Sequence, residues 1–214
     1  MKFLSGISLA AIMLAGAATP SFATSLAPGG TVTPTLDTTA NFLGAANFTI
    51  LGNTGAVAYT SGSNSGTIQE WVGTWSANPV AGDHIVFVYQ VTVASGVAAR
   101  VTGGSYAGFT TDVFDNADGG GTTAPVDATR SAGTGVVVGF DFNPNLLPGA
   151  KSYFLIVDTN ATTFTSGPMS VIDDTTFTGT GFAPSNVPEP STLSLLGSGL
   201  LALGAGLRRK MLRK

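Results

Sequence analysis

HIVFVYQVTV, from His84 to Val93, is the stretch that decides the fold of this chain. Side chains alternate between the two faces of an extended strand. The odd positions would therefore share one face and the even positions the other. The odd face is made of Ile85, Phe87, Tyr89, Val91 and Val93, and the even face of Val86, Val88, Gln90 and Thr92. This alternation predicts a long central strand.

Other short runs rich in β-branched and aromatic residues lie on both sides of this stretch, separated by Gly, Pro, Asn and Asp. They cover residues 48–51, 56–60, 67–75, 98–101, 106–114, 135–142, 152–158, 162–165, 169–172 and 175–178. Between Thr24 and Asn186 no window has a helical period, and 23 glycines and 8 prolines interrupt each candidate. Because each strand has one apolar face to bury, we expect an all-β domain, an antiparallel Greek-key β-sandwich of Ig-like or jelly-roll type.

Two of these runs contain the same four residues, TTFT, at 162–165 and 175–178. Nothing recurs along the chain at the longer periods of solenoids or propellers. The likeness therefore indicates two neighbouring strands with similar packing rather than a repeat.

The first 23 of the 214 residues differ in composition from the body that follows. Lys2 precedes an apolar stretch, and small residues stand just before Thr24. This pattern is typical of a secretory signal peptide cleaved between Ala23 and Thr24. An uncleaved anchor is the alternative, but the apolar stretch is short and Pro20 interrupts it. Residues 24–186 then form a body the size of one domain.

Residues 187–214 form a tail that begins with Pro188, Glu189 and Pro190. Prolines fix φ and lack an N–H group, so they favour an extended peptide that a processing enzyme can bind. The stretch 193–207 carries no charge, and as a helix it would be about 22 Å long, short of the ~30 Å hydrocarbon core.

A basic cluster that includes Arg208, Arg209 and Lys210 follows this apolar stretch. By the positive-inside bias it would act as a membrane stop and hold the C-terminus in the cytoplasm. Pro-Glu-Pro, a short apolar helix and a basic end, in this order, resemble the PEP-CTERM sorting signal, also known under an ice-binding heading. A permanent tail anchor is the alternative.

The resemblance implies export from a Gram-negative bacterium and removal of the tail by a membrane-embedded exosortase. It also implies a place at the cell surface or in an exopolysaccharide or biofilm matrix. The body is similar to uncharacterised cargo domains of such proteins, from GTVTPT at 30–35 to FTGTGFAPS at 177–185. That similarity implies no activity.

Charge and cysteine content exclude several classes of function. Residues 24–186 carry three basic and eleven acidic residues, so the body lacks the basic surface that binds nucleic acid. The chain has no cysteine, which excludes disulfides, thiolate nucleophiles and cysteine zinc sites. The fold must therefore be stabilised by its core.

Few residues suggest catalysis. His84 is the only histidine and follows Asp83, but no G-x-S-x-G nucleophile elbow is present, and we interpret His84 as a solvated turn residue. Glu70 is the only glutamate of the body, and several aspartates lie in turn contexts. We expect a non-enzymatic protein without a required cofactor.

Two groups of residues are weak candidates for ligand binding. Asp115, Asn116 and Asp118 precede a glycine run and have some features of a calcium loop, although the bidentate Glu is missing. Trp71 and Trp75 are four apart, so on a strand they would share a face and could stack on a sugar. Packing within the sandwich is the alternative for both. Alternate threonines, as in TTFTGT at 175–180, would suit ice or an ordinary exposed strand.

The expected function is therefore that of an exported structural or adhesive protein of the cell surface or extracellular matrix, with exosortase and the secretion machinery as partners. Before processing it would be anchored in the inner membrane through its C-terminal helix. A polysaccharide- or calcium-dependent binding module is the alternative, ahead of ice binding and hydrolysis.

Overall fold

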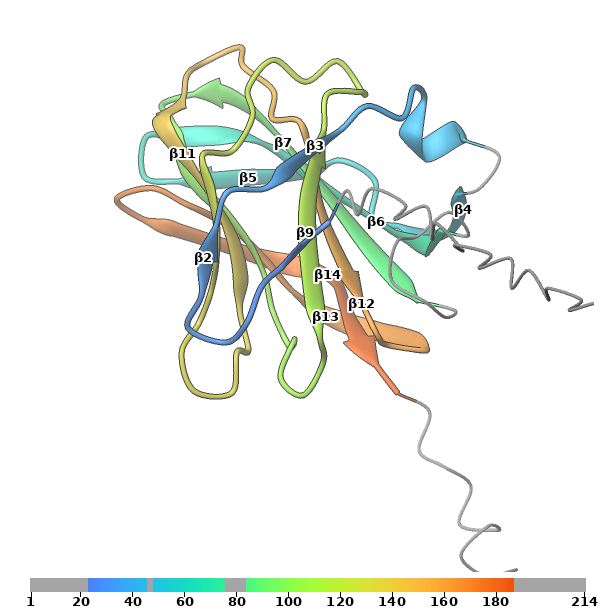
Figure 1. Ribbon diagram of the computed structural model, residues 1–214. Coiled ribbons are helices and arrows are strands. Elements are labelled where there is room, and N and C mark those ends of the chain that lie inside the picture. Colours follow the sequence, from blue (N-terminus) through green and yellow to red (C-terminus); the bar gives the residue numbers. More distant parts are fainter. Residues whose placement is uncertain (1–22, 46–47, 76–83, 187–214) are drawn as a thin grey trace, which may run out of the picture.

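The computed structural model describes residues 23–45, 48–75 and 84–186, and in these ranges the chain forms two β-sheets packed against each other (Figure 1). The larger sheet has the strand order β1-β9-β12-β7-β6-β4, with β3 beside β9 and β5 beside β6. Its strands are β1 (Thr24–Ser25), β3 (Thr35–Asp37), β4 (Phe48–Asn53), β5 (Val57–Ser61), β6 (Asn64–Trp75), β7 (Ile85–Ser95), β9 (Thr111–Asn116) and β12 (Phe154–Thr159).

The smaller sheet has the strand order β14-β13-β8-β11-β10-β2. Its strands are β2 (Thr31–Val32), β8 (Ala98–Gly103), β10 (Asp127–Arg130), β11 (Val138–Leu146), β13 (Thr163–Ile172) and β14 (Thr176–Ser185). The prediction of an all-β sandwich is thus confirmed, and residues 85–93 of the quoted stretch form the first nine residues of β7, directly after His84.

The main core lies between the two sheets. The odd positions of β7, among them Phe87, Tyr89 and Val91, are buried there against residues of the smaller sheet such as Val101 and Val171. Burial of a large apolar side chain contributes about 1.5–3 kcal/mol, so this layer is the principal source of stability.

A second core covers the opposite face of the larger sheet, where Val86 and Val88 lie. The short 3-10 helix η1 (Phe42–Gly44) packs there, with Phe42 only 1% exposed. Strand β7 is therefore buried on both faces, which explains why its even positions are also largely apolar.

Strand boundaries differ from the prediction where the chain turns. The predicted strand 106–114 begins only at Thr111, because Ser105 and Gly108 have positive φ angles of 68° and 84° and bend the preceding segment. The short strands β1, β2, β3 and β10 and the helix η1 were not predicted. Strand β3 also pairs parallel to β9, an exception to the expected antiparallel pattern.

The two TTFT runs lie in neighbouring strands, as predicted. Residues 162–165 and 169–172, expected as separate strands, both contribute to β13, which pairs with β14 over its whole length (Figure 1). The likeness therefore reflects one long hairpin in the smaller sheet.

Within the described ranges, no helix has the length and apolar composition needed to cross a membrane. The predicted signal peptide up to Phe22 and the predicted apolar helix of the tail lie outside the described residues.

Candidate functional site

The folded body starts and ends close to the two predicted processing regions. Strand β1 begins at Thr24, directly after Ala23, and pairs with β9. Strand β14 ends at Ser185. Pro188, Glu189 and Pro190, and the basic cluster of Arg208, Arg209 and Lys210, lie outside the described residues.

Trp71 and Trp75 share one face of β6, as the strand interpretation predicted, but that face is covered. Trp75 is 5% exposed and lies between Phe42, at a centroid distance of 5.4 Å, and Phe114, at 5.3 Å. Trp71 is 9% exposed and makes an edge contact with Phe154. The stacking surfaces that a sugar would need are occupied by protein rings, so the idea of an open aromatic platform is wrong.

The proposed calcium loop is built differently from the expected one. Asp115 and Asn116 are the last two residues of β9, so their side chains point to opposite faces. The Asn116 amide donates to Oδ2 of Asp37 at 2.9 Å. Oδ2 of Asp118 accepts the Phe42 N–H at 2.6 Å. The polar groups of Asn116 and Asp118 thus hold β3 and η1 in place over the second core.

The described ranges contain no group of three or more His, Asp or Glu side chains placed to hold a metal ion. A cavity of about 260 Å³ lies beside β3 and β9, but Asp37 on its wall already accepts hydrogen bonds from Thr39 and Asn116. The bond from the Thr39 N–H is the local turn contact expected of such an aspartate. The geometry therefore does not favour this segment as a calcium site.

Asp115 is buried in a less polar environment. It is 4% exposed, and its Oδ1 has no hydrogen-bond partner among the described residues. Its pKa is raised to about 6, chiefly by burial and also by the nearby Asp37 carboxylate, against the lowering effect of a backbone hydrogen bond. As the pH falls, this carboxylate therefore takes up a proton at a higher pH than an ordinary aspartate does.

His84 is not the solvated turn residue that we expected. It is 8% exposed, and its Nδ1 lies 2.6 Å from the carbonyl oxygen of Thr159. The ring joins the start of β7 to the end of β12, a role that the sequence around His84 does not indicate.

A polar cluster that the sequence did not reveal lies between the sheets. Glu70 of β6 is fully buried, and its Oε2 accepts the Phe182 N–H of β14 at 2.8 Å. A Cβ atom at residue 181 would collide with this carboxylate, which explains the glycine there. Burial raises the pKa of Glu70 to about 8, against the lowering effects of the Phe182 and Tyr89 hydrogen bonds. Glu70 is therefore mostly protonated at neutral pH.

Two tyrosines complete this cluster. The hydroxyl groups of Tyr89 and Tyr106 lie 2.7 Å apart, and both side chains are fully buried. Burial raises the pKa of each phenol well above its usual value, and at the pH where Glu70 is ionised its negative charge adds to the effect. Both phenols therefore stay neutral over the physiological range.

Arg130 of β10 is a second buried polar residue, 5% exposed. Its guanidinium donates to four carbonyl oxygens and one hydroxyl, at distances of 2.7–3.2 Å. The acceptors belong to Gly135, Leu26, Thr111, Tyr106 and Phe109. All five N–H donors of the guanidinium are used in this way. Although Arg130 lines a cavity of about 430 Å³, no donor remains for an anionic ligand.

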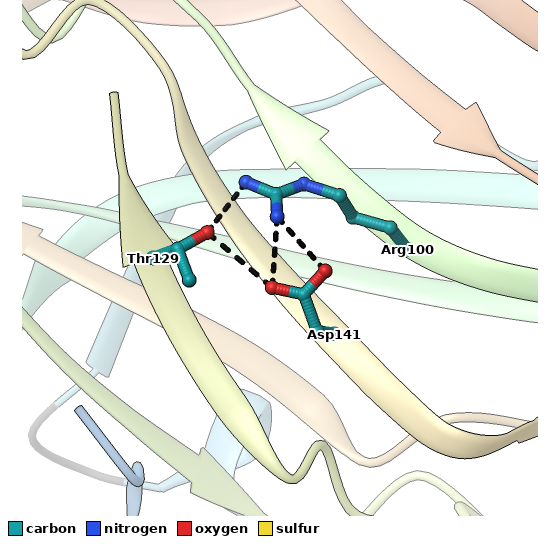
Figure 2. A network of polar contacts seen from close by, with 3 residues as sticks. All are labelled: Arg100, Thr129 and Asp141. Carbon is teal, nitrogen blue, oxygen red and sulfur yellow. Dashed lines mark hydrogen bonds and ion pairs between the residues drawn. The ribbon is translucent and has the colours of Figure 1, made fainter. Parts of the chain in front are cut away.

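A surface ion pair lies on the smaller sheet. Arg100 of β8 donates two hydrogen bonds of 2.8 Å to the carboxylate of Asp141 on β11, and a third of 2.6 Å to the Thr129 hydroxyl on β10 (Figure 2). The two charged side chains are 27% and 34% exposed. Solvent screening limits the contribution of such pairs to about 0–1 kcal/mol. This network therefore adds little to the free energy of unfolding, and its main effect is to hold β8, β10 and β11 in register.

The described polar groups thus serve mainly to join strands and loops of the sandwich. Comparison with known proteins is informative for the tail: residues 186–210 match the PEP-CTERM protein-sorting motif. This match confirms the resemblance drawn from Pro-Glu-Pro, the apolar stretch and the basic end. No curated protein and no solved structure matches the chain.

Proposed function

We propose that this chain, an exosortase-targeted extracellular protein by its PEP-CTERM motif, serves as a non-enzymatic structural or adhesive component of the cell surface or extracellular matrix. Exopolysaccharide or biofilm matrix is the environment in which it would act. The observation that carries the proposal is the sorting motif at residues 186–210, directly after the last strand of the sandwich.

The chemistry of the body supports a structural role. Glu70 is protonated and bonded to the β14 backbone, and Arg130 is saturated by five acceptors. Asp37 and Asp118 hold η1 and its neighbours. Each of these groups contributes to the fold, which suits a protein whose task is to persist outside the cell.

The alternative of a binding module receives no support from the residues that suggested it. The rings of Trp71 and Trp75 are covered, and the polar groups of Asn116 and Asp118 are engaged within the protein. We therefore propose no ligand for these positions.

Fractionation of cells that produce the tagged full chain tests this role. We expect the protein to co-sediment with the extracellular matrix and to be released when the exopolysaccharide is digested enzymatically. Deleting its gene should weaken the cohesion of the matrix. A chain that is recovered only as free protein in the medium, with unchanged matrix in the deletion strain, would contradict the proposal.

A further inference from the structure

Strand β14 is the outermost strand of the smaller sheet in the part of the chain that the structure describes (Figure 1). It is ten residues long and pairs with β13 along one side. Strand β5 also contacts β14, for example through Tyr59 and Phe177, whose ring centroids are 5.9 Å apart. This is packing of side chains between the sheets, so one edge of β14 has no paired strand within the described ranges.

The backbone groups on that edge can be identified from one hydrogen bond. The Phe182 N–H is bound by Glu70 and therefore points away from β13. In an antiparallel ladder, the N–H and C=O of one residue point to the same side, and those of the next residue to the other. Thr176, Thr178 and Thr180 have the same parity as Phe182, so their backbone groups also point to the free edge.

The side chains of these three threonines are exposed. The Thr178 hydroxyl lies 3.0 Å from that of Ser170 on β13, which places it on the outer face of the sheet. Residues 176–180 thus offer an extended, uncharged edge whose exposed side chains are the three threonines.

Sheet edges in soluble proteins are usually protected by a charged residue, a proline, a bulge or a covering segment. Pairing of β14 with β13 runs without a shift in register, and the edge from Thr176 to Thr180 contains no Lys, Arg or Pro. Among the described residues, protection starts only at the ends of this edge. Before this edge lie Asp173, Asp174 and Thr175, whose hydroxyl accepts a hydrogen bond from the Ser61 hydroxyl of β5 at 2.7 Å, and after it lies the Glu70 bond at Phe182. The open part therefore has a defined length.

We propose that this edge is an interface with a second copy of this chain, in which two β14 strands pair antiparallel about a two-fold axis at Thr178. In this register Thr176 faces Thr180 of the second copy, and the two Thr178 residues face each other. The facing pairs on the outer face are then Thr–Thr pairs, which are favourable across strands, and Phe177 faces Gly179 of the second copy on the inner face. The two smaller sheets would form one continuous sheet.

The identity of the partner follows from the charge of the body and from the match of the uncharged segment 176–180 with itself. The body is acidic, with eleven acidic against three basic residues, so most of its surface repels a second copy. Residues 176–180 carry no charge, and a two-fold axis at Thr178 matches this uncharged segment with itself. The inference rests on the edge of β14 and holds whether or not the protein acts in a matrix.

Cysteine cross-linking of the full chain tests the register, because the chain has no cysteine of its own. Facing residues of this kind have Cα atoms about 5.5 Å apart. We expect Thr178→Cys to cross-link with itself through a short thiol-specific reagent. Thr176→Cys mixed with Thr180→Cys should also cross-link, at least ten times more than either variant alone, because equal positions are then about 13 Å apart.

Two controls keep the test decisive. Thr165→Cys places a thiol at an exposed position of β13 and should give only background cross-linking. Adding Thr178→Lys to the Thr176→Cys and Thr180→Cys pair puts two like charges at the axis and should abolish the product, with an unchanged circular dichroism spectrum. Absence of the Thr178→Cys product, or equal yields from the mixed pair and the single variants, would overturn the proposal.

Discussion

Replacing Arg130 by methionine is expected to lower the free energy of unfolding by about 3–5 kcal/mol. Methionine replaces the aliphatic stem of the arginine but is shorter, so the variant loses the guanidinium and leaves a cavity in its place. Four carbonyl oxygens and one hydroxyl then each lose a donor inside the protein. The oxygens of Leu26 and Tyr106 keep a second donor, the Thr111 hydroxyl and the Phe109 N–H. Urea unfolding of the purified full chain, followed by the fluorescence of the two buried tryptophans, measures the change.

Arg100→Met is the matched control, because it removes the same group from a partly exposed ion pair. Its expected cost is about 0–1 kcal/mol. Arg130→Lys should fall between the two, since an ammonium group has three donors and cannot reach all five acceptors. Equal losses for Arg130→Met and Arg100→Met would show that the buried guanidinium does not hold these loops together.

Glu70→Gln is expected to change how stability depends on pH. In the folded state the pKa of Glu70 is raised by burial to about 8, against an ordinary value of 4.5. Between these values the folded chain holds a proton that the unfolded chain has released. The free energy of unfolding of the natural chain should therefore fall as the pH rises from about 5 to 8, by up to about 1.4 kcal/mol per pH unit.

The glutamine variant has no proton to lose at this position, so its unfolding free energy should fall less than that of the natural chain between pH 6 and 8. Asp115, whose pKa is raised to about 6, contributes a slope near pH 6 in both chains, so the difference between the two chains isolates the effect of Glu70. Denaturant melts at pH 6, 7 and 8 compare the two chains. Parallel curves for the natural chain and the variant would mean that Glu70 is ionised in the fold.

The fold class could be predicted because it depends on local alternation. The odd positions of β7, such as Phe87 and Val91, lie between the sheets as expected. The same pattern could not show that the even face is also covered, because the cover is η1, which is distant in sequence. For this reason the alternation left two interpretations open for Trp71 and Trp75.

The buried polar residues could not be predicted. The acceptors of Arg130 come from Leu26, Tyr106, Phe109, Thr111 and Gly135, and no local pattern links them. Short strands such as β1 and β3 exist only through their pairing with β9, so their own residues carry little signal. The sorting motif was recognisable because its residues are consecutive.

Intact-mass measurement of the protein from the medium and from envelope fractions, in cells with and without the exosortase, tests the central claim most directly. We predict a species that begins at Thr24 and ends near Pro190, and that disappears when the enzyme is absent. A species that keeps Arg208 to Lys214 in the membrane of cells with the enzyme would contradict the account, because the tail would then be a permanent anchor.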